Sequence, residues 1–163
     1  MSEKIVIAGV GMIPFKKPGQ SDSYDVMGAA AVRKALTDAG IGYDQVQSAY
    51  ASYVYGDSCA GQAALYRVGI TGIPIVNVNN NCASGSTAFS LATQAIKHGI
   101  HECALAVGFE QMQPGAVDMV FPDRPSPIAR HNKAAADLLG LSEAERKLPP
   151  AVQLFGCQVD LTK

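Results

Sequence analysis

The residues best suited to chemistry lie in the stretch Ile73–Phe89. A short apolar run there leads into the three asparagines Asn79–Asn81, then into Cys82, and then into a run of small residues. This order predicts that Cys82 lies where a strand gives way to the start of a helix. The first turn of a helix carries unpaired N–H groups and a partial positive charge, and both favour a thiolate over a thiol. Since the thiolate is the nucleophilic form, Cys82 is a candidate catalytic nucleophile.

The residues that follow Cys82 support this interpretation. They are all small: Ala83, Ser84, Gly85 and Ser86. Small side chains would let neighbouring backbone and a substrate acyl group come close to the thiol. An ordinary buried cysteine at a helix start would not need them, although the pattern alone leaves that alternative open.

The other three cysteines are interpreted as packing residues. Cys59 lies at a glycine-flanked helix entry, where packing is favoured over a role in lining a site. Cys103 lies within an apolar strand-like run, and Cys157 follows a glycine near the end of the chain. Since no CxxC pair and no histidine at ligand spacing occurs, we expect no metal site, and reduced thiols in a cytosol-like compartment.

Three further features have a plain structural explanation. His98 and His101 bracket a glycine at a predicted helix end, where a cation complements the helix dipole. His131 lies in a proline-rich segment and is expected on a solvated surface, with contact to a phosphorylated ligand as the alternative. The Gly9–Gly11 segment invites a dinucleotide-binding interpretation. That interpretation fails because prolines follow instead of a helix, and no third glycine stands at the required spacing.

Composition limits the class of protein. The chain has 163 residues, of which 48% are hydrophobic and 17% charged, and its formal net charge is −1. These values predict a soluble globular domain that can bury a sizeable core. They argue against a nucleic acid or an anionic membrane as a partner held by bulk charge. With no signal peptide or transmembrane segment in the sequence, we expect a cytoplasmic protein.

The hydrophobic pattern predicts alternating strands and helices. Apolar strands are expected at residues 4–10, 46–54, 75–79 and 103–109, the first of them buried. Helices are expected at residues 24–39, 62–68 and 83–98. This alternation predicts an α/β fold with a mostly parallel sheet, helices on both faces and right-handed crossovers.

The character of the chain changes after Glu110. Six of the nine prolines lie beyond this point, and a helical pattern is recognisable only at residues 128–139 and again from about Pro150. We therefore expect an α/β domain at residues 1–112, and the beginning of a loop or excursion region at residues 113–163. Because the chain ends inside a predicted helix, we expect an incomplete protein.

At this point a family resemblance can be stated. The segments Gly56–Gln62 and Gly72–Ala88 resemble the thiolases, and most of all the sterol-carrier-protein type, the thiolase-like lipid-transfer proteins. Further similar segments are Val10–Met12 with Phe15, Lys16, Pro18 and Gly19, then Gly108–Met112, Phe121–Arg124 and Gln153–Gly156. The resemblance covers essentially the whole chain, and its most specific block is Asn79–Ser86.

The resemblance implies an activity. In thiolases the cysteine matching Cys82 attacks a 3-ketoacyl-CoA and takes its acyl group as a thioester, which a second coenzyme A then removes. It implies the same nucleophile here, an acyl-CoA substrate, coenzyme A as co-substrate and no permanently bound cofactor. It also implies a homo-oligomer, because the strand at residues 75–79 resembles the thiolase edge strand that pairs across a dimer axis.

The departures from the family pattern leave three functions open. Complete thiolases have a second α/β half whose motifs, Gly-His-Pro among them, supply the base, most oxyanion-hole donors and an acid/base cysteine; this chain resembles only the first half. It is therefore expected to be a fragment or subunit of an acyl-CoA acyltransferase, inactive without a complementary half. The alternatives are a non-catalytic acyl- or lipid-binding or lipid-transfer domain, and a subunit of a thiolase-like lyase acting on steroid side chains. The sequence does not distinguish chain length or direction of reaction.

Overall fold

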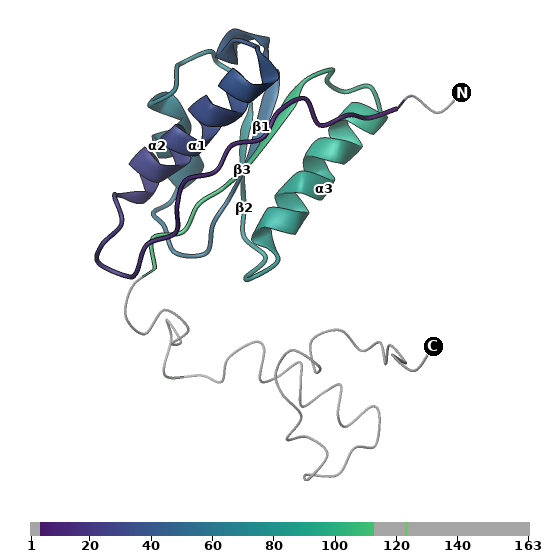
Figure 1. Cartoon of the computed structure of the whole chain (residues 1–163). Helices are drawn as coiled ribbons and strands as arrows, with labels where there is room; N and C mark the ends of the chain where they lie inside the picture. Colours follow the sequence, from purple (N-terminus) through teal and green to yellow (C-terminus); the bar gives the residue numbers. More distant parts are fainter. Residues whose placement is uncertain (1–3, 113–122, 124–163) are drawn as a thin grey trace, which may run out of the picture. The chain divides into compact units, whose positions relative to one another are not determined.

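The computed structural model describes residues 4–112 and Asp123. Among these residues one parallel sheet is formed by β1 (Ser48–Ser52), β2 (Ile75–Val78) and β3 (Ala104–Gly108), in the order β2-β1-β3 (Figure 1). The helices are α1 (Tyr24–Ala39), the short 3-10 helix η1 (Tyr43–Gln45), α2 (Ala60–Tyr66) and α3 (Ser84–Lys97). The predicted α/β class and parallel sheet are confirmed.

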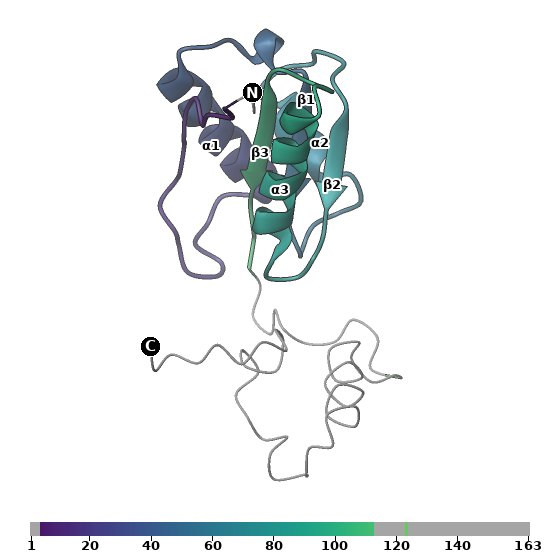
Figure 2. The ribbon, with the colours of Figure 1, turned by 90° about the vertical axis from the view of Figure 1, so that its right-hand side faces the viewer.

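The helices cover both faces of the sheet. Helices α1 and α2 pack against each other on one face, whereas α3 packs against β1 and β3 on the other face (Figure 1). Figure 2 shows the same arrangement from the side of α3, with the sheet between it and α1. This confirms the prediction that helices lie on both faces.

Small side chains let α2 approach the sheet closely. Ala51 on β1 and Ala60 and Ala64 on α2 are fully buried. A Cβ atom added at Gly61 would lie 2.5 Å from the Cβ atom of Ala51, so only glycine fits there. Larger side chains complete this core, namely Val32, Leu65, Val107 and Phe109.

The prediction of a buried first strand at residues 4–10 is wrong. The segment is extended but pairs with no strand, and Ile7 is 67% exposed. It lies along α1 instead, where the Val10 N–H donates a 2.8 Å hydrogen bond to Asp38 Oδ2. Close contact is possible because a Cβ atom at Gly9 would lie only 2.5 Å from the backbone of α1. An apolar run indicates a strand-forming segment but does not reveal a competing helix side chain that binds its backbone.

The other described elements are confirmed, with shifts at their ends. Each strand is shorter than predicted at one or both ends, because strand limits follow backbone pairing rather than side-chain pattern. Helix α3 begins at Ser84, one residue later than predicted. Helix α2 begins at Ala60, before the predicted start, because Cys59 adopts a left-handed conformation (φ 63°) that turns the chain into the helix.

Several predictions fall outside the described residues. They concern the helices at residues 128–139 and from about Pro150, and the surroundings of His131 and Cys157. The division at residue 112 stays a prediction. Among the described helices, none has the length and apolar character needed to cross a lipid bilayer.

Candidate active site

The candidate site lies at the carboxyl end of the sheet. Because the three strands are parallel, the chain leaves all of them at the same edge, at the lower end of the sheet in Figure 1. The turn at residues 79–83 follows β2 and leads into α3, and Phe109–Met112 follows β3. Open parallel α/β sheets bind their ligands at this edge.

Cys82 lies in the turn between β2 and α3, as the sequence predicts. Its side chain is exposed, so the alternative of a buried helix-start cysteine is wrong. Asn81, directly before it, has a positive φ of 50°, a conformation that non-glycine residues other than asparagine and aspartate seldom adopt. Backbone N–H groups of Ala83 and Ser84 donate to the carbonyls of Asn80 and Asn81, each at 3.0 Å. The turn therefore presents the thiol outward from a fixed backbone.

Polar side chains hold this turn in place. Asn79 Oδ1 accepts a 3.1 Å hydrogen bond from the Asn81 N–H. The Ser84 hydroxyl accepts from the Asn80 N–H at 2.8 Å and donates to the Asn81 carbonyl at 2.7 Å. The Asn80 side chain donates to the Thr87 hydroxyl at 3.0 Å. The three asparagines and the serine thus have structural roles around the thiol, which explains why these residue types occur together.

No side chain caps the start of α3, where the helix carries a partial positive charge. The N-cap residue is Ala83, which has no side chain able to cap the helix, and no acidic residue lies in the first turn. An uncapped helix N-terminus favours a nearby anion. Cys82 directly precedes Ala83, so it lies at this end of the helix.

The surface beside Cys82 is open. A Cβ atom added at Gly85 would meet no described atom nearer than the Ser52 hydroxyl at 4.0 Å. Gly85 and Ser86 are both exposed in the first turn of α3. The small residues therefore leave open space in the first turn of α3, and the approach of an acyl group there stays a prediction.

Asn77 links the strand leading to Cys82 with the start of α2. Its Oδ1 accepts a 2.8 Å hydrogen bond from the Gly61 N–H, and its Nδ2 donates to Gln62 Oε1 at 2.7 Å. The Gln62 side chain in turn donates to the Ile75 carbonyl at 3.3 Å. The polar asparagine inside an apolar strand is the sequence signal for this link.

Glu110 connects the ends of β1 and β3. Its two carboxylate oxygens accept hydrogen bonds from the backbone N–H groups of Val54 at 2.8 Å and Tyr55 at 2.9 Å. Gln111 Oε1 accepts from the Tyr24 N–H at 2.9 Å, which joins the start of α1 to the same place. These two side chains were not predicted as site residues. They fix three loops at the edge where Cys82 lies.

Stacked aromatic side chains lie at the same edge of the sheet. Phe109 stacks on Tyr24 and on Tyr53, with ring centroids 5.7 Å and 5.4 Å apart. The Tyr24 hydroxyl donates a 2.9 Å hydrogen bond to Asp57 Oδ2. This hydrogen bond, together with desolvation by burial, raises the pKa of Tyr24 above its ordinary value, because ionisation would remove the donated proton.

The remaining candidates from the sequence have minor roles. Cys59 is exposed, so its interpretation as a buried packing residue is wrong; its backbone at the N-cap of α2 is left-handed. Burial raises the pKa of the Cys103 thiol, as expected for a packing cysteine. His98 is the C-cap residue of α3, where the sequence places it. No cluster of three metal-ligating side chains occurs among residues 4–112 and Asp123.

The chain is similar to known proteins of one family. A family model described as "Thiolase, N-terminal domain" matches residues 5–148. The chain is 47% identical to sterol carrier protein 2 from Oryctolagus cuniculus, over 94% of this chain and 28% of the relative. It is 41% identical to non-specific lipid-transfer protein-like 2 from Caenorhabditis elegans, over 94% of this chain and 37% of that relative.

Two proteins of lower sequence identity are also similar to this chain. The chain is 34% identical to benzoylsuccinyl-CoA thiolase subunit BbsB from Thauera aromatica, over 68% of this chain and 29% of the relative. The solved structure of OleA from Xanthomonas campestris with bound lauric acid and lauroyl-CoA shares the fold, with a TM-score of 0.51 at 17% identity over 71% of this chain and 37% of that chain. The chain spans no more than 37% of the length of these proteins. The resemblance seen in the sequence is confirmed, and this chain belongs to the thiolase family through its N-terminal domain.

Proposed function

We propose that the chain supplies the nucleophile of a thiolase-type acyl-CoA C-acyltransferase, with Cys82 as the acyl acceptor. The observation that carries the proposal is the exposed Cys82 thiol at the uncapped start of α3. The unpaired N–H groups of the first turn of α3 lie at the same end of the helix, and such groups favour a nearby anion. The open surface at Gly85 leaves room for the acyl group.

The proposed substrate is a 3-ketoacyl-CoA, with free coenzyme A as co-substrate. The Cys82 sulfur attacks the 3-keto carbon, and the bond between carbons 2 and 3 then breaks. Its electron pair goes to carbon 2, which takes up a proton and leaves as acetyl-CoA or propanoyl-CoA. The acyl group stays on Cys82 as a thioester. A deprotonated coenzyme A thiol then attacks this thioester, releases the shortened acyl-CoA and restores the Cys82 thiolate.

The remaining groups for this reaction are proposed to come from a second half. Among the described residues, the thiol of Cys82 has one polar partner, Asn81 Oδ1 at 3.7 Å. A general base typically contributes about 10²–10⁴-fold to the rate, and an oxyanion-hole donor about 10²–10³-fold. Because the relatives are much longer than this chain, we propose that a C-terminal half or a separate subunit carries these groups.

We also propose a homo-oligomer and a cytosol-like compartment. β2 is an edge strand of the described sheet, so the backbone N–H and C=O groups on its outer side are available for pairing with a second copy. The three described cysteines are free thiols, as expected where the surroundings are reducing.

A lipid carrier is the second candidate function. The names of the relatives, sterol carrier protein 2 and non-specific lipid-transfer protein-like 2, favour it. In this case the fold would bind an acyl chain or sterol and Cys82 would form no covalent bond. A subunit of a steroid side-chain lyase is a narrower variant of the enzymatic proposal.

A single-turnover acylation experiment separates the candidates. Because the base and the oxyanion-hole donors are proposed to lie on a second half, the chain is incubated with radiolabelled p-nitrophenyl acetate, an activated acyl donor that requires neither. The labelled peptide is then identified by mass spectrometry. The acyltransferase proposal predicts label on Cys82 in the unmodified chain and in Cys59→Ser, and none in Cys82→Ser. Cys59 is the matched control because it is also an exposed thiol at a helix start. Label on Cys59 and Cys82 alike, or on neither, would contradict the proposal and favour a carrier.

A further inference from the structure

The side-chain amide of Asn81 lies beside the Cys82 thiol. Its one polar contact with a described residue is the 3.7 Å hydrogen bond that Oδ1 accepts from Sγ of Cys82. The backbone of Asn81 is held on both sides. Its N–H donates to Asn79 Oδ1 at 3.1 Å, and its carbonyl accepts from the N–H and the hydroxyl of Ser84, at 3.0 Å and 2.7 Å. Asn81 thus combines a fixed backbone with an exposed side chain whose second amide atom, Nδ2, has no described partner.

The two atoms at the end of this side chain can exchange places. Oδ1 is an acceptor, and Nδ2 carries N–H donors. The torsion that exchanges them, χ2 of asparagine, has a broad and roughly two-fold energy profile. Since no other described residue binds the Asn81 amide, half a turn breaks only the contact with Cys82 and re-forms it through the other atom. The amide can therefore offer Cys82 either an acceptor or a donor.

The protonation state of the sulfur determines which of the two atoms it binds. A thiol has a weak S–H donor and suits Oδ1, which is the arrangement in this structure. A thiolate has no proton and can only accept, so it suits Nδ2. Hydrogen bonds to an ionised partner are roughly twice as strong as those between neutral groups. An amide that turns therefore stabilises the thiolate more than it stabilises the thiol.

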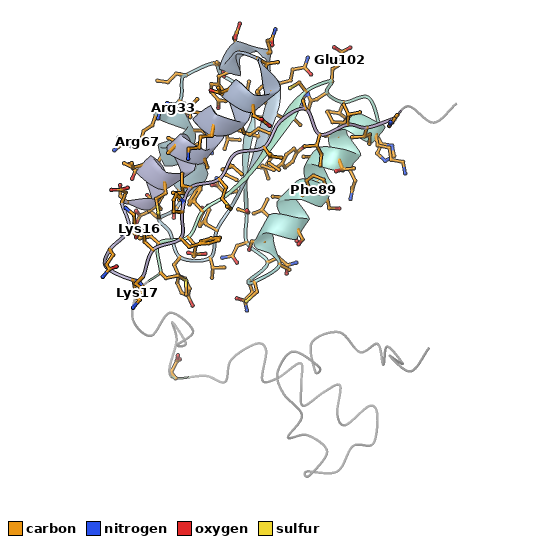
Figure 3. All side chains as sticks on the ribbon, in the orientation of Figure 1. Lys16, Lys17, Arg33, Arg67, Phe89 and Glu102 are labelled. Atoms are coloured by element: carbon orange, nitrogen blue, oxygen red, sulfur yellow. The ribbon has the colours of Figure 1, made fainter. Side chains whose placement is uncertain are left out.

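The charged side chains around this turn have other places or partners. The elements on either side of Cys82, β2 and α3, carry one titratable side chain, Lys97 in the last turn of α3. At the same edge of the sheet, the Glu110 carboxylate binds two backbone N–H groups after β1. In Figure 3, Lys17 lies on the side of α1, away from the start of α3, and Glu102 lies at the opposite end of the sheet. Within the described part of the chain, no charged side chain is hydrogen-bonded to the thiol.

We propose that the Asn81 amide turns when Cys82 loses its proton, and that Nδ2 then donates a hydrogen bond to the sulfur. This inference rests on the proposed role of Cys82 as the nucleophile. The proton passes to the base of the proposed second half or, in the isolated chain, to water. Asn79 and Asn80 hold the turn through their hydrogen bonds, whereas Asn81 acts on the reacting atom itself.

Alkylation of Cys82 by iodoacetamide over a range of pH tests this proposal on the full chain, with peptide mass spectrometry as the readout. Asn81→Gly removes the amide and tolerates the positive φ of 50°, so the backbone of the turn is kept. Because the thiolate is the reactive form, loss of its donor should move the midpoint of the pH profile upward and lower the rate at neutral pH about threefold or more. Cys59 in the same molecules is the internal control, and its rate should not change.

The direction of the change separates a donor from an acceptor. An amide that only accepts from the thiol would hold the proton on the sulfur, so its removal would speed alkylation. A rise in the rate, no change, or a fall of less than about threefold would therefore overturn the proposal. If Cys82 still reacts first among the cysteines in that case, the proposed nucleophile stands and only the role of Asn81 fails.

A second measurement decides if Asn81→Gly does not fold. In the unmodified, isotope-labelled chain, the NMR signals of the Asn81 side-chain NH₂ group should shift with pH along the same profile as the alkylation of Cys82. Cys82→Ser has no thiolate and should abolish this shift. An Asn81 side-chain signal that stays constant while Cys82 ionises, or that shifts equally in Cys82→Ser, would overturn the proposal.

Discussion

The carboxylate of Glu110 accepts a hydrogen bond from the backbone N–H of Val54 at 2.8 Å and a second from Tyr55 at 2.9 Å. It thereby holds the loop that follows β1 against the end of β3. Both bonds are charge-assisted and partly buried, so they are stronger than a typical neutral hydrogen bond. It therefore ties the loops after β1 and β3 together at the edge of the sheet that carries Cys82.

Replacement of Glu110 tests this role. Glu110→Gln keeps the size of the side chain but can accept only one of the two hydrogen bonds. It should lower the free energy of unfolding by about 1–2 kcal/mol, measured by urea denaturation. Glu102→Gln is the matched control, since the Glu102 side chain has no hydrogen bond or ion pair to a described residue. Equal effects of the two substitutions would contradict the role given to Glu110.

The hydrogen bond from Tyr24 to Asp57 predicts a pH dependence of stability. The pKa of Tyr24 is raised above its ordinary value of 10.0, first by this hydrogen bond. The stabilisation of the folded chain by this hydrogen bond is therefore present below pH 10. It is lost as the pH rises through the raised pKa of Tyr24. Tyr24→Phe should be less stable than the unmodified chain at pH 7, and the difference should shrink above pH 10. Tyr66→Phe, at an exposed tyrosine, serves as the control; a Tyr24 difference that grows at high pH would refute the assignment.

Much of the fold follows from the sequence, and the exceptions have identifiable causes. The periodicity of α1 and its glycine end at Gly40 are visible in the sequence, and Gly40 has the left-handed conformation expected there. The N-terminal segment shows the limit, because its hydrogen bond to Asp38 depends on a helix distant in sequence. Local pattern predicts which segments can form strands, not which partners they take.

In the candidate site, too, only some features can be predicted from the sequence. Cys82 is predictable because the strand, the asparagines and the small residues around it are contiguous. The roles of Asn77, Gln62 and Glu110 cannot be predicted in this way, because their hydrogen-bond partners lie 13 or more residues away along the chain. The exposure of Cys59 and its left-handed backbone conformation are likewise not visible in the sequence.

The proposed division of labour between two halves predicts an inactive chain. Loss of the general base and of most oxyanion-hole donors should leave the purified 163-residue chain without measurable thiolysis of acetoacetyl-CoA. The assay follows the loss of the 3-ketoacyl-CoA by ultraviolet absorbance in the presence of free coenzyme A. Sustained turnover by the chain alone would show that the groups assigned to a second half are present in this one.

The exposed edge at β2 predicts association. The unmodified chain should sediment as a dimer or larger species whose proportion rises with concentration. The carbonyls of Pro74 and Val78 accept hydrogen bonds from β1 and the residue after it, so the alternating Ile75 faces the free edge. Ile75→Pro removes its backbone N–H and should weaken the association, whereas Ile75→Val keeps the N–H and should not. A monomer at every concentration, for the unmodified chain, would exclude this interface.

The central claim is that Cys82 is the reactive nucleophile, and competitive alkylation tests it most directly. The chain is treated with limiting iodoacetamide at neutral pH, and the modification of each cysteine over time is followed by mass spectrometry. Cys82 should react first, faster than Cys59, which is also exposed, and faster than Cys103, whose thiol pKa is raised by burial. Cys157 should also react more slowly than Cys82. Modification of Cys82 last among the four would contradict its assignment as the nucleophile.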